Sequence, residues 1–304
     1  VGIGSHMQKK LILELKNLNI KIDSYVSSTE KPILFTSHYF SCLKKAIKVL
    51  PKEILFIVAS PPSLHYEQIK LISNNGFDVF IEKPAFLSLE QFKVIKRIVD
   101  TRKIIIFESL MYLENNIVKK IITKYSKNKN QIVSINTNFI IPSFVQGSYR
   151  NNSNFEDSLF TDMICYPISF LVELGFRLDI NNFSYSISRK KTKTIFRLKF
   201  IVGKTDLEFS FGEGEYYKNN FLIKLENNNE LECFPFFYGR EGSRTVIYRN
   251  SKREVEKNYF ENNCFEKLFQ HSRDYWLQNQ SYRLKNLKKV TSIIEQISKE
   301  IKEY

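Results

Sequence analysis

The clearest pattern in the sequence is an alternation of apolar and amphipathic segments between Ile54 and Pro84. ILFIVAS reads as a short apolar strand, PPSLHYEQIKLISNN has helical spacing, and GFDVFIEKP is a turn followed by a second apolar strand. Short apolar runs bounded by Pro and Gly are typical of strands buried on both faces of a parallel sheet. The order predicts half of a nucleotide-binding sheet, with Glu82 and Lys83 at the edge where such sheets bind ligands.

The same order of elements extends toward the N-terminus. Leu11, Leu15 and Leu18 have helical spacing, and IKIDSYVSS follows as a second strand. The preceding VGIGSHM allows two interpretations. Gly-Ser-His-Met resembles a protease-cleavage scar, but Val1-Gly2-Ile3 precedes it, and the roughly 20 residues to the end of the second strand match a dinucleotide fingerprint. The spacing favours the fingerprint and predicts that the first strand is clipped upstream.

The glycine-rich turn supplies the first cofactor-binding candidates. Gly2 would allow a tight bend, and Gly4 would let the backbone approach a pyrophosphate, because free N–H groups and the helix dipole favour anions there. In the dinucleotide fingerprint a third glycine lets the helix pack closely on the strand, and Met7 replaces it. Ser5 and His6 complete this predicted cofactor-binding turn.

The end of the second strand bears on the choice of cofactor. It carries no acidic residue to hydrogen-bond a ribose 2′-hydroxyl, whereas Ser27 and Ser28 could donate to a 2′-phosphate. This favours NADP over NAD, although serines are also common in ordinary turns.

The second half of the chain has a different pattern. Apolar and polar residues alternate with period two in QIVSINTNFIIP, FSYSISR, KTIFRLKFIVG, TDLEFSFGE, NFLIKLEN, ELECFPFF and RTVIYRN. Such alternation predicts an antiparallel sheet with one buried face. DMICYPISFLVELGF is expected to be a helix placed before most of these strands, and VTSIIEQISKEIKEY an amphipathic C-terminal helix.

The expected fold class is therefore α/β plus α+β. Residues 1–108 would form a Rossmann dinucleotide-binding domain. Residues 109–304 would form a substrate and oligomerisation domain with a large, mostly antiparallel, open-faced sheet and the C-terminal helix.

Composition narrows the function classes. The net charge of +14 invites a nucleic-acid interpretation, but the lysines are spread along the chain, so a solvated basic surface or a phosphate-bearing ligand is favoured. The four cysteines form no CxxC pair and are expected to be reduced, and the four histidines show no metal-ligand spacing, so no metal is predicted. No apolar run approaches the roughly 20 residues that span a bilayer, and no leader is recognisable. We expect a cytoplasmic protein without nucleic-acid or membrane partners.

Taken together, these segments resemble the Gfo/Idh/MocA family of NAD(P)-dependent oxidoreductases. The matching pieces are GIGSHMQKK, ASPPSLHYEQ, GFDVFIEKP and DSLFTDMICYPISFLVELG. The resemblance implies that the turn after the fourth strand contacts the nicotinamide side of the cofactor. It also implies that Lys83 lies beside the nicotinamide and the reacting carbon, with Glu82 as its neighbour. The residues implied in that turn are Ser60, Pro61 and His65.

A second catalytic element of the family has the pattern D-x-G-x-H. Here it reads Asp162 to Tyr166, so a tyrosine stands at the histidine position, as in the branch similar to sugar ketoreductases. A tyrosine hydroxyl can donate a proton to a developing alkoxide if an adjacent ammonium, for which Lys83 is the candidate, lowers its pKa. Asp162 would orient Lys83 or a substrate hydroxyl. The alternative is that Tyr166 only packs as an aromatic residue.

Several positions depart from the family pattern. Asn154–Ser158 replace the glycines that precede the aspartate, and Ile164 occupies a glycine position. Leu113 and Glu114 stand where many members carry Arg and His for substrate contact.

Two functions follow from these observations. The first is hydride transfer between nicotinamide and a hydroxyl or ketone carbon of a sugar or sugar nucleotide. The alternative is a catalytically retired member that acts as a nucleotide-binding or assembly protein. A homo-oligomer, dimer or tetramer, is expected, with the many Phe and Tyr residues of the open sheet face compatible with a dimer.

Overall fold

The computed structural model describes residues 1–2, 4, 7, 11–28, 30, 38–142, 155–190 and 193–302. The chain divides into two compact units. Unit 1 comprises Val1–Leu110 and Phe265–Glu295, and unit 2 comprises Met111–Cys264 and the residues from Gln296 onward.

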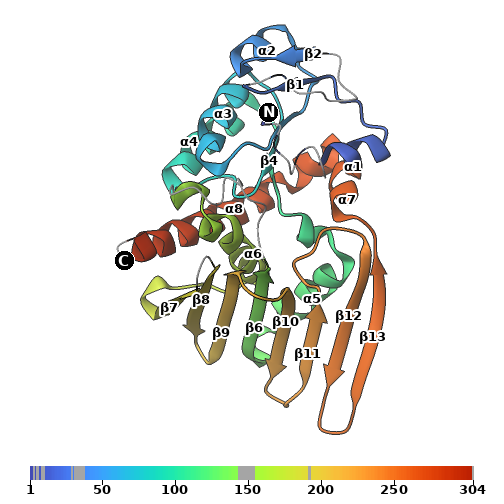
Figure 1. Cartoon of the computed structure of the whole chain (residues 1–304), viewed down its shortest axis with the longest axis vertical. Helices are drawn as coiled ribbons and strands as arrows, with labels where there is room; N and C mark the ends of the chain where they lie inside the picture. Colours follow the sequence, from blue (N-terminus) through green and yellow to red (C-terminus); the bar gives the residue numbers. More distant parts are fainter. Residues whose placement is uncertain are drawn as a thin grey trace. The chain divides into compact units, whose positions relative to one another are not determined.

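Unit 1 is an α/β unit (Figure 1). Its strands are short and parallel, and they are ordered β1-β2 in one sheet and β3-β4-β5 in another. The elements are α1 (Ile12–Asn17), β1 (Ser24–Val26), β2 (His38–Phe40), α2 (Leu43–Val49), β3 (Phe56–Val58), α3 (Pro62–Asn74), β4 (Val79–Glu82), α4 (Leu89–Arg102), β5 (Ile106–Ser109), most of α7 (Cys264–Gln270) and most of α8 (Arg273–Lys302).

The backbone of Val1 and Gly2 joins the two small sheets. The Gly2 N–H donates to the Val26 carbonyl at 3.1 Å, and the Ala59 N–H donates to the Val1 carbonyl at 2.8 Å. The dipeptide therefore lies between β1 and β3, which gives the order β2-β1-dipeptide-β3-β4-β5. This is the strand order of a doubly wound dinucleotide-binding sheet, and it confirms the predicted Rossmann fold class.

The C-terminal helix differs from its prediction. α8 begins at Arg273 rather than near Val290, and as far as Glu295 it belongs to unit 1, not to the second domain. The reason is that α8 carries an apolar stripe, and local sequence does not tell which unit the stripe packs on. In the structure, Leu284 and Leu287 lie in the core of unit 1, and Trp276 stacks on Phe107 with ring centroids 4.0 Å apart.

Unit 2 is built on an eight-stranded sheet of order β13-β12-β11-β10-β6-β9-β8-β7. All neighbours are antiparallel except β6 and β9, so the predicted mostly antiparallel sheet is confirmed. Its longer elements are α5 (Asn116–Lys127), β6 (Ile132–Ile141), α6 (Leu159–Glu173), β7 (Phe183–Lys190), β8 (Lys193–Val202), β9 (Thr205–Glu213), β10 (Lys218–Leu225), β11 (Glu230–Phe234), β12 (Gly242–Arg249) and β13 (Glu254–Glu261). The edge strand β13 was not predicted, because most of its residues are exposed and leave no apolar alternation.

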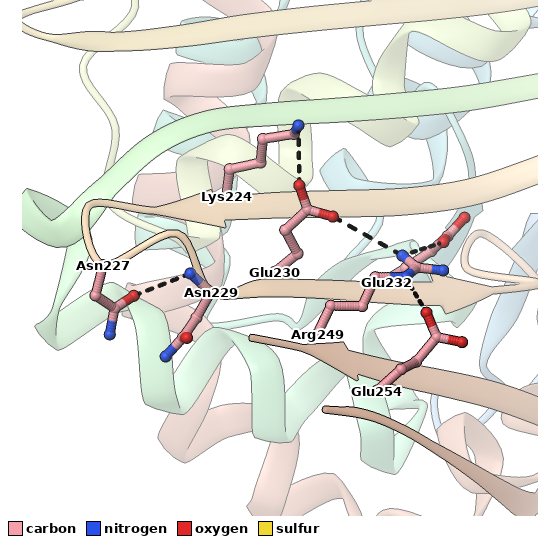
Figure 2. Close-up of polar contacts among 7 residues, drawn as sticks. All are labelled: Lys224, Asn227, Asn229, Glu230, Glu232, Arg249 and Glu254. Atoms are coloured by element: carbon pink, nitrogen blue, oxygen red, sulfur yellow. Dashed lines mark hydrogen bonds and ion pairs between the residues drawn. The ribbon is translucent and has the colours of Figure 1, made fainter. Parts of the chain in front are cut away.

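Many aromatic residues of the sheet are buried on its helix-covered face, whereas Phe234 of β11 and Phe260 of β13 are 40% and 69% exposed. Phe160 of α6 packs edge-to-face on Phe196, with ring centroids 5.1 Å apart. The other face carries charged side chains (Figure 2): in the part of this face that the figure draws, Arg249 pairs with Glu232 at 2.9 Å and with Glu254 at 2.6 Å. Homo-oligomerisation through this face remains a prediction, and a dimer formed there would bring charged side chains into contact.

Candidate functional site

In unit 1, the glycine turn and the turn after β3 lie against each other. Gly2 has a φ of +83°, and a Cβ atom placed on it would fall 2.5 Å from the Ser60 backbone nitrogen. Only glycine fits this position, because the conformation is left-handed and the space is filled by backbone. Ser60 is buried and its Oγ donates to Gln68 Oε1 at 2.7 Å, while Pro61 immediately precedes α3.

His65 connects that turn to the segment that carries Lys83. The ring is buried, with Nε2 2.8 Å from the Ser60 carbonyl oxygen and Nδ1 2.9 Å from the Pro84 carbonyl oxygen. Both ring nitrogens therefore face backbone carbonyls of two different turns. In the structure, His65 holds these turns in register, whereas the family resemblance implied a contact with the cofactor.

Lys83 follows directly on β4, at the carboxyl edge of the parallel sheet, as predicted. The Lys83–Pro84 peptide bond is cis. Glu82 is the last residue of β4 and pairs in register with Ser109 of β5. The two sequence-predicted residues of this turn therefore lie at the ligand-binding edge of the sheet.

Glu108 is a residue of this edge that sequence analysis missed. It lies near the end of β5, is buried, and its Oε1 accepts the Ala85 N–H at 2.7 Å. Burial raises the pKa of its carboxyl to about 7; the Ala85 hydrogen bond and the nearby Lys83 charge oppose this shift, and Glu82 adds to it. A single acid at the end of the otherwise apolar strand KIIIFES is the signal that could have revealed it.

The raised pKa of Glu108 predicts a pH-dependent stability. In the folded state the carboxyl keeps its proton above the unfolded pKa of about 4.5, so its contribution to stability is complete below 4.5 and is lost as pH rises toward 7. Glu108→Gln cannot titrate. We expect the free energy of unfolding of the wild type, relative to this variant, to fall by about 3 kcal/mol between pH 4.5 and 8.

Urea denaturation of both proteins across this pH range measures the difference. Glu90→Gln is the matched control, because Glu90 lies in the first turn of α4 with its side chain 71% exposed. A wild type whose stability relative to Glu108→Gln is constant over this range would contradict the prediction.

The remaining cofactor candidates lie where a dinucleotide could be held. A Cβ on Gly4 would meet no atom of the described residues within 4 Å, which leaves the open space that a pyrophosphate requires. Met7 is buried, and Ser27 follows β1 with its N–H donating to the Phe40 carbonyl at 3.2 Å. Ser28 lies one residue further on, whereas Ser5 and His6 lie outside the described residues. The described residues of this turn, Gly2, Gly4 and Met7, leave room for a dinucleotide, and its binding there remains a prediction.

In unit 2, α6 carries the second predicted element. Ser158 caps the helix by accepting the Thr161 N–H, and Asp162 and Tyr166 follow one turn apart on the same side. Both side chains are buried, at 4% and 5% exposed. Ile164 is also buried but lies two residues from each, so it projects from a different side of the helix.

Tyr166 lies in an aromatic cluster. Its ring packs edge-to-face on Phe139, with centroids 4.9 Å apart, and its hydroxyl contacts Met111 Sδ at 3.9 Å. The Tyr112 hydroxyl donates to the Tyr166 carbonyl at 3.2 Å and thereby fixes this turn of α6. The packed ring agrees with the alternative that Tyr166 packs as an aromatic residue, and its role as a proton donor remains a prediction.

Of the positions that depart from the family pattern, Asn154 lies outside the described residues, and Glu114 has an ion-pair partner. Glu114 is buried, and its carboxylate pairs with Lys119 at 2.5 Å. Among the described residues, no cluster of His, Cys, Asp or Glu could hold a metal ion, and no described helix is long and apolar enough to cross a membrane.

Comparisons with known proteins agree with this geometry. Residues 27–109 match the family model described as oxidoreductase family, NAD-binding Rossmann fold, of the Gfo/Idh/MocA group, which confirms the resemblance seen in the sequence. No curated protein matches the chain by sequence.

Similar folds occur among solved structures. KijD10, a 3-ketoreductase from Actinomadura kijaniata in complex with NADP and TDP-benzene, superposes with a TM-score of 0.79 and 14% identity, over 97% of this chain and 94% of that one. An aldose-aldose oxidoreductase from Caulobacter crescentus, complexed with glycerol, gives 0.78 and 13%, over 100% and 96%.

Proposed function

We propose, because residues 27–109 belong to the NAD-binding Rossmann fold of the Gfo/Idh/MocA oxidoreductase family, that this protein is an NAD(P)-dependent oxidoreductase. Its substrate would be a sugar or sugar nucleotide that reacts at a hydroxyl or ketone carbon. The observation that carries the proposal is the sheet edge of unit 1, where Lys83 stands in a turn held by two buried side chains, His65 and Glu108.

The chemistry divides between the cofactor and the chain. A bound nicotinamide dinucleotide supplies or accepts the hydride. Tyr166 would give its hydroxyl proton to the oxygen on the reacting carbon, or take it back in the other direction. The Lys83 ammonium would favour the charge that develops there, and Asp162 would orient the reacting groups.

The substrate class is supported by fold relatives and by charge. The similar structures are a ketoreductase crystallised with NADP and a nucleoside-diphosphate compound, and an aldose-aldose oxidoreductase. The net charge of +14 suits a phosphate-bearing substrate or cofactor. Ser27 and Ser28 at the end of β1, without an acid, favour NADP over NAD.

A retired, nucleotide-binding member is the second candidate. It is favoured by Glu114, whose carboxylate is tied to Lys119 at a position where many family members carry a substrate-binding residue. Such a protein would bind the cofactor but turn over no sugar.

A parallel titration with NADH and NADPH, followed by nicotinamide fluorescence, tests the proposal. We expect both to bind, with NADPH the tighter. Ser28→Asp, which adds a carboxylate at the end of β1, should weaken NADPH about tenfold by repelling the 2′-phosphate, and should spare NADH. Failure of both cofactors to bind would contradict the proposed function. Binding without turnover of any sugar or sugar nucleotide would support the retired member.

A further inference from the structure

Arg244 of β12 is a buried cation whose donors are not all used. The side chain is 0% exposed, and its Nη2 donates to the carbonyls of Tyr238 at 2.7 Å and Arg240 at 3.3 Å. Its Nε and Nη1 are buried and have no hydrogen-bond partner in the part of the chain that the structure describes. Burying an ionised group with unused donors is costly unless something compensates it.

A second arginine on the same strand, Arg249, does form ion pairs. Arg249 lies five residues further along β12, so it points to the opposite face of the sheet. Figure 2 shows its ion pairs with Glu230, Glu232 and Glu254. The half-exposed arginine of β12 thus has three carboxylates, whereas within the described residues the fully buried one has no ion pair.

The surroundings of Arg244 suit an anion. The Tyr238 ring centroid lies 5.1 Å from its Cζ. Burial raises the pKa of Tyr217, and the Arg244 charge is one of the contributions that oppose this rise. The nearest acid along the paired strand is Glu261, but its two oxygens accept the Asn116 and Ile117 N–H groups at the start of α5. Both oxygens of this carboxylate therefore hydrogen-bond the helix N-terminus.

Arg244 is also linked to the predicted proton donor. The loop that receives its hydrogen bonds contains Phe237, whose ring lies 5.7 Å from that of Tyr166. Asn219 fixes the same loop, because its Oδ1 accepts the Phe237 N–H at 2.7 Å and its Nδ2 donates to the Tyr217 hydroxyl at 2.9 Å. Tyr166, Phe237, Tyr238 and Arg244 thus form one continuous set of contacts within unit 2.

We propose that Arg244 binds an anionic oxygen group of the substrate, a carboxylate or a phosphate. This rests on the proposed function, since it assigns the group to the substrate of the same reaction. The guanidinium supplies the charge and the unused N–H donors, which make strong hydrogen bonds to such anions. Movement of the Tyr238 side chain would admit the anionic group.

The test compares two matched pairs of ligands. Their binding to the full chain loaded with NADPH is measured by calorimetry. UDP-glucuronate carries a carboxylate where UDP-glucose carries a hydroxymethyl group, and glucose 1-phosphate carries a phosphate that glucose lacks. We expect the anionic member of one pair to bind at least about tenfold more tightly, and the pair that shows the difference identifies the group. Equal binding within both pairs would overturn the proposal.

Substitutions of Arg244 complete the test. Arg244→Met should abolish the preference for the anion, and Arg244→Lys should retain part of it. Arg249→Met is the matched control on the same strand and should leave the preference unchanged. Cofactor affinity, measured separately by nicotinamide fluorescence, should be equal in all variants, so that loss of cofactor binding would count against the proposed function and not against Arg244. Arg244→Met with an unchanged preference for the anionic ligand would contradict the assignment. If that variant does not fold, an unchanged preference in Arg244→Lys would contradict it.

Discussion

Lys83→Ala is expected to reduce turnover by at least about 10³-fold while the protein still binds its cofactor. The physical reason is that an ammonium fixed beside the developing oxygen charge is worth several kcal/mol in a water-poor site. Lys83 follows β4 at the carboxyl edge of the sheet in unit 1, and its charge already acts on the buried Glu108 carboxyl. Steady-state rates with a panel of sugars and sugar nucleotides, followed by nicotinamide absorbance, give the loss.

Two further measurements make this result specific. Lys93→Ala removes a half-exposed lysine of α4 and should keep wild-type rates. Cofactor titration of Lys83→Ala should give a dissociation constant within about threefold of the wild type, because the turn proposed to bind the phosphates is a different segment of the unit. Wild-type turnover in Lys83→Ala would show that the lysine is not the catalytic group.

Tyr166→Phe is expected to have the second largest effect, a loss of about 10² to 10⁴ in kcat, the range associated with removing a general acid. The ring contacts with Phe139, Tyr112 and Phe237 would be retained, since only the hydroxyl is removed. The variant should therefore fold with nearly unchanged stability. If Tyr166 is the proton donor, the pH–rate profile of Tyr166→Phe should lack the limb that reports the ionisation of this hydroxyl.

The alternative role of Tyr166 gives the opposite result. If the side chain only packs, Tyr166→Phe keeps kcat, and its thermal midpoint stays the same. Tyr248→Phe serves as the control, because Tyr248 is a half-exposed tyrosine at the far end of β12. Turnover of Tyr166→Phe equal to that of this control would remove Tyr166 from the mechanism.

Periodicity predicted the regular elements well and the boundaries between the units poorly. The strands β3 and β4 are continuous apolar runs, and β8 to β12 alternate, so their identity follows from local sequence. The expected C-terminal helix covered residues 290–304, whereas α8 begins at Arg273, because only tertiary contacts of Trp276 and Leu284 assign its first half to unit 1. Pro167 within α6 did not break the helix, which is buried along almost its whole length.

Local sequence was enough to predict three features. These are the Rossmann fold of the N-terminal part, the position of Lys83 at the edge of its sheet, and the i, i+4 spacing that puts Asp162 and Tyr166 on one side of a helix. Each depends on residues close together in the chain, where strand ends and helical spacing decide where side chains lie. The tertiary structure alone decided that His65 and Glu108 hold the Lys83 turn, and that Arg244 is buried with unused donors while Arg249 is paired. These features depend on packing between segments far apart in sequence, and burial is what raises the pKa of Glu108 and makes the unused donors of Arg244 costly.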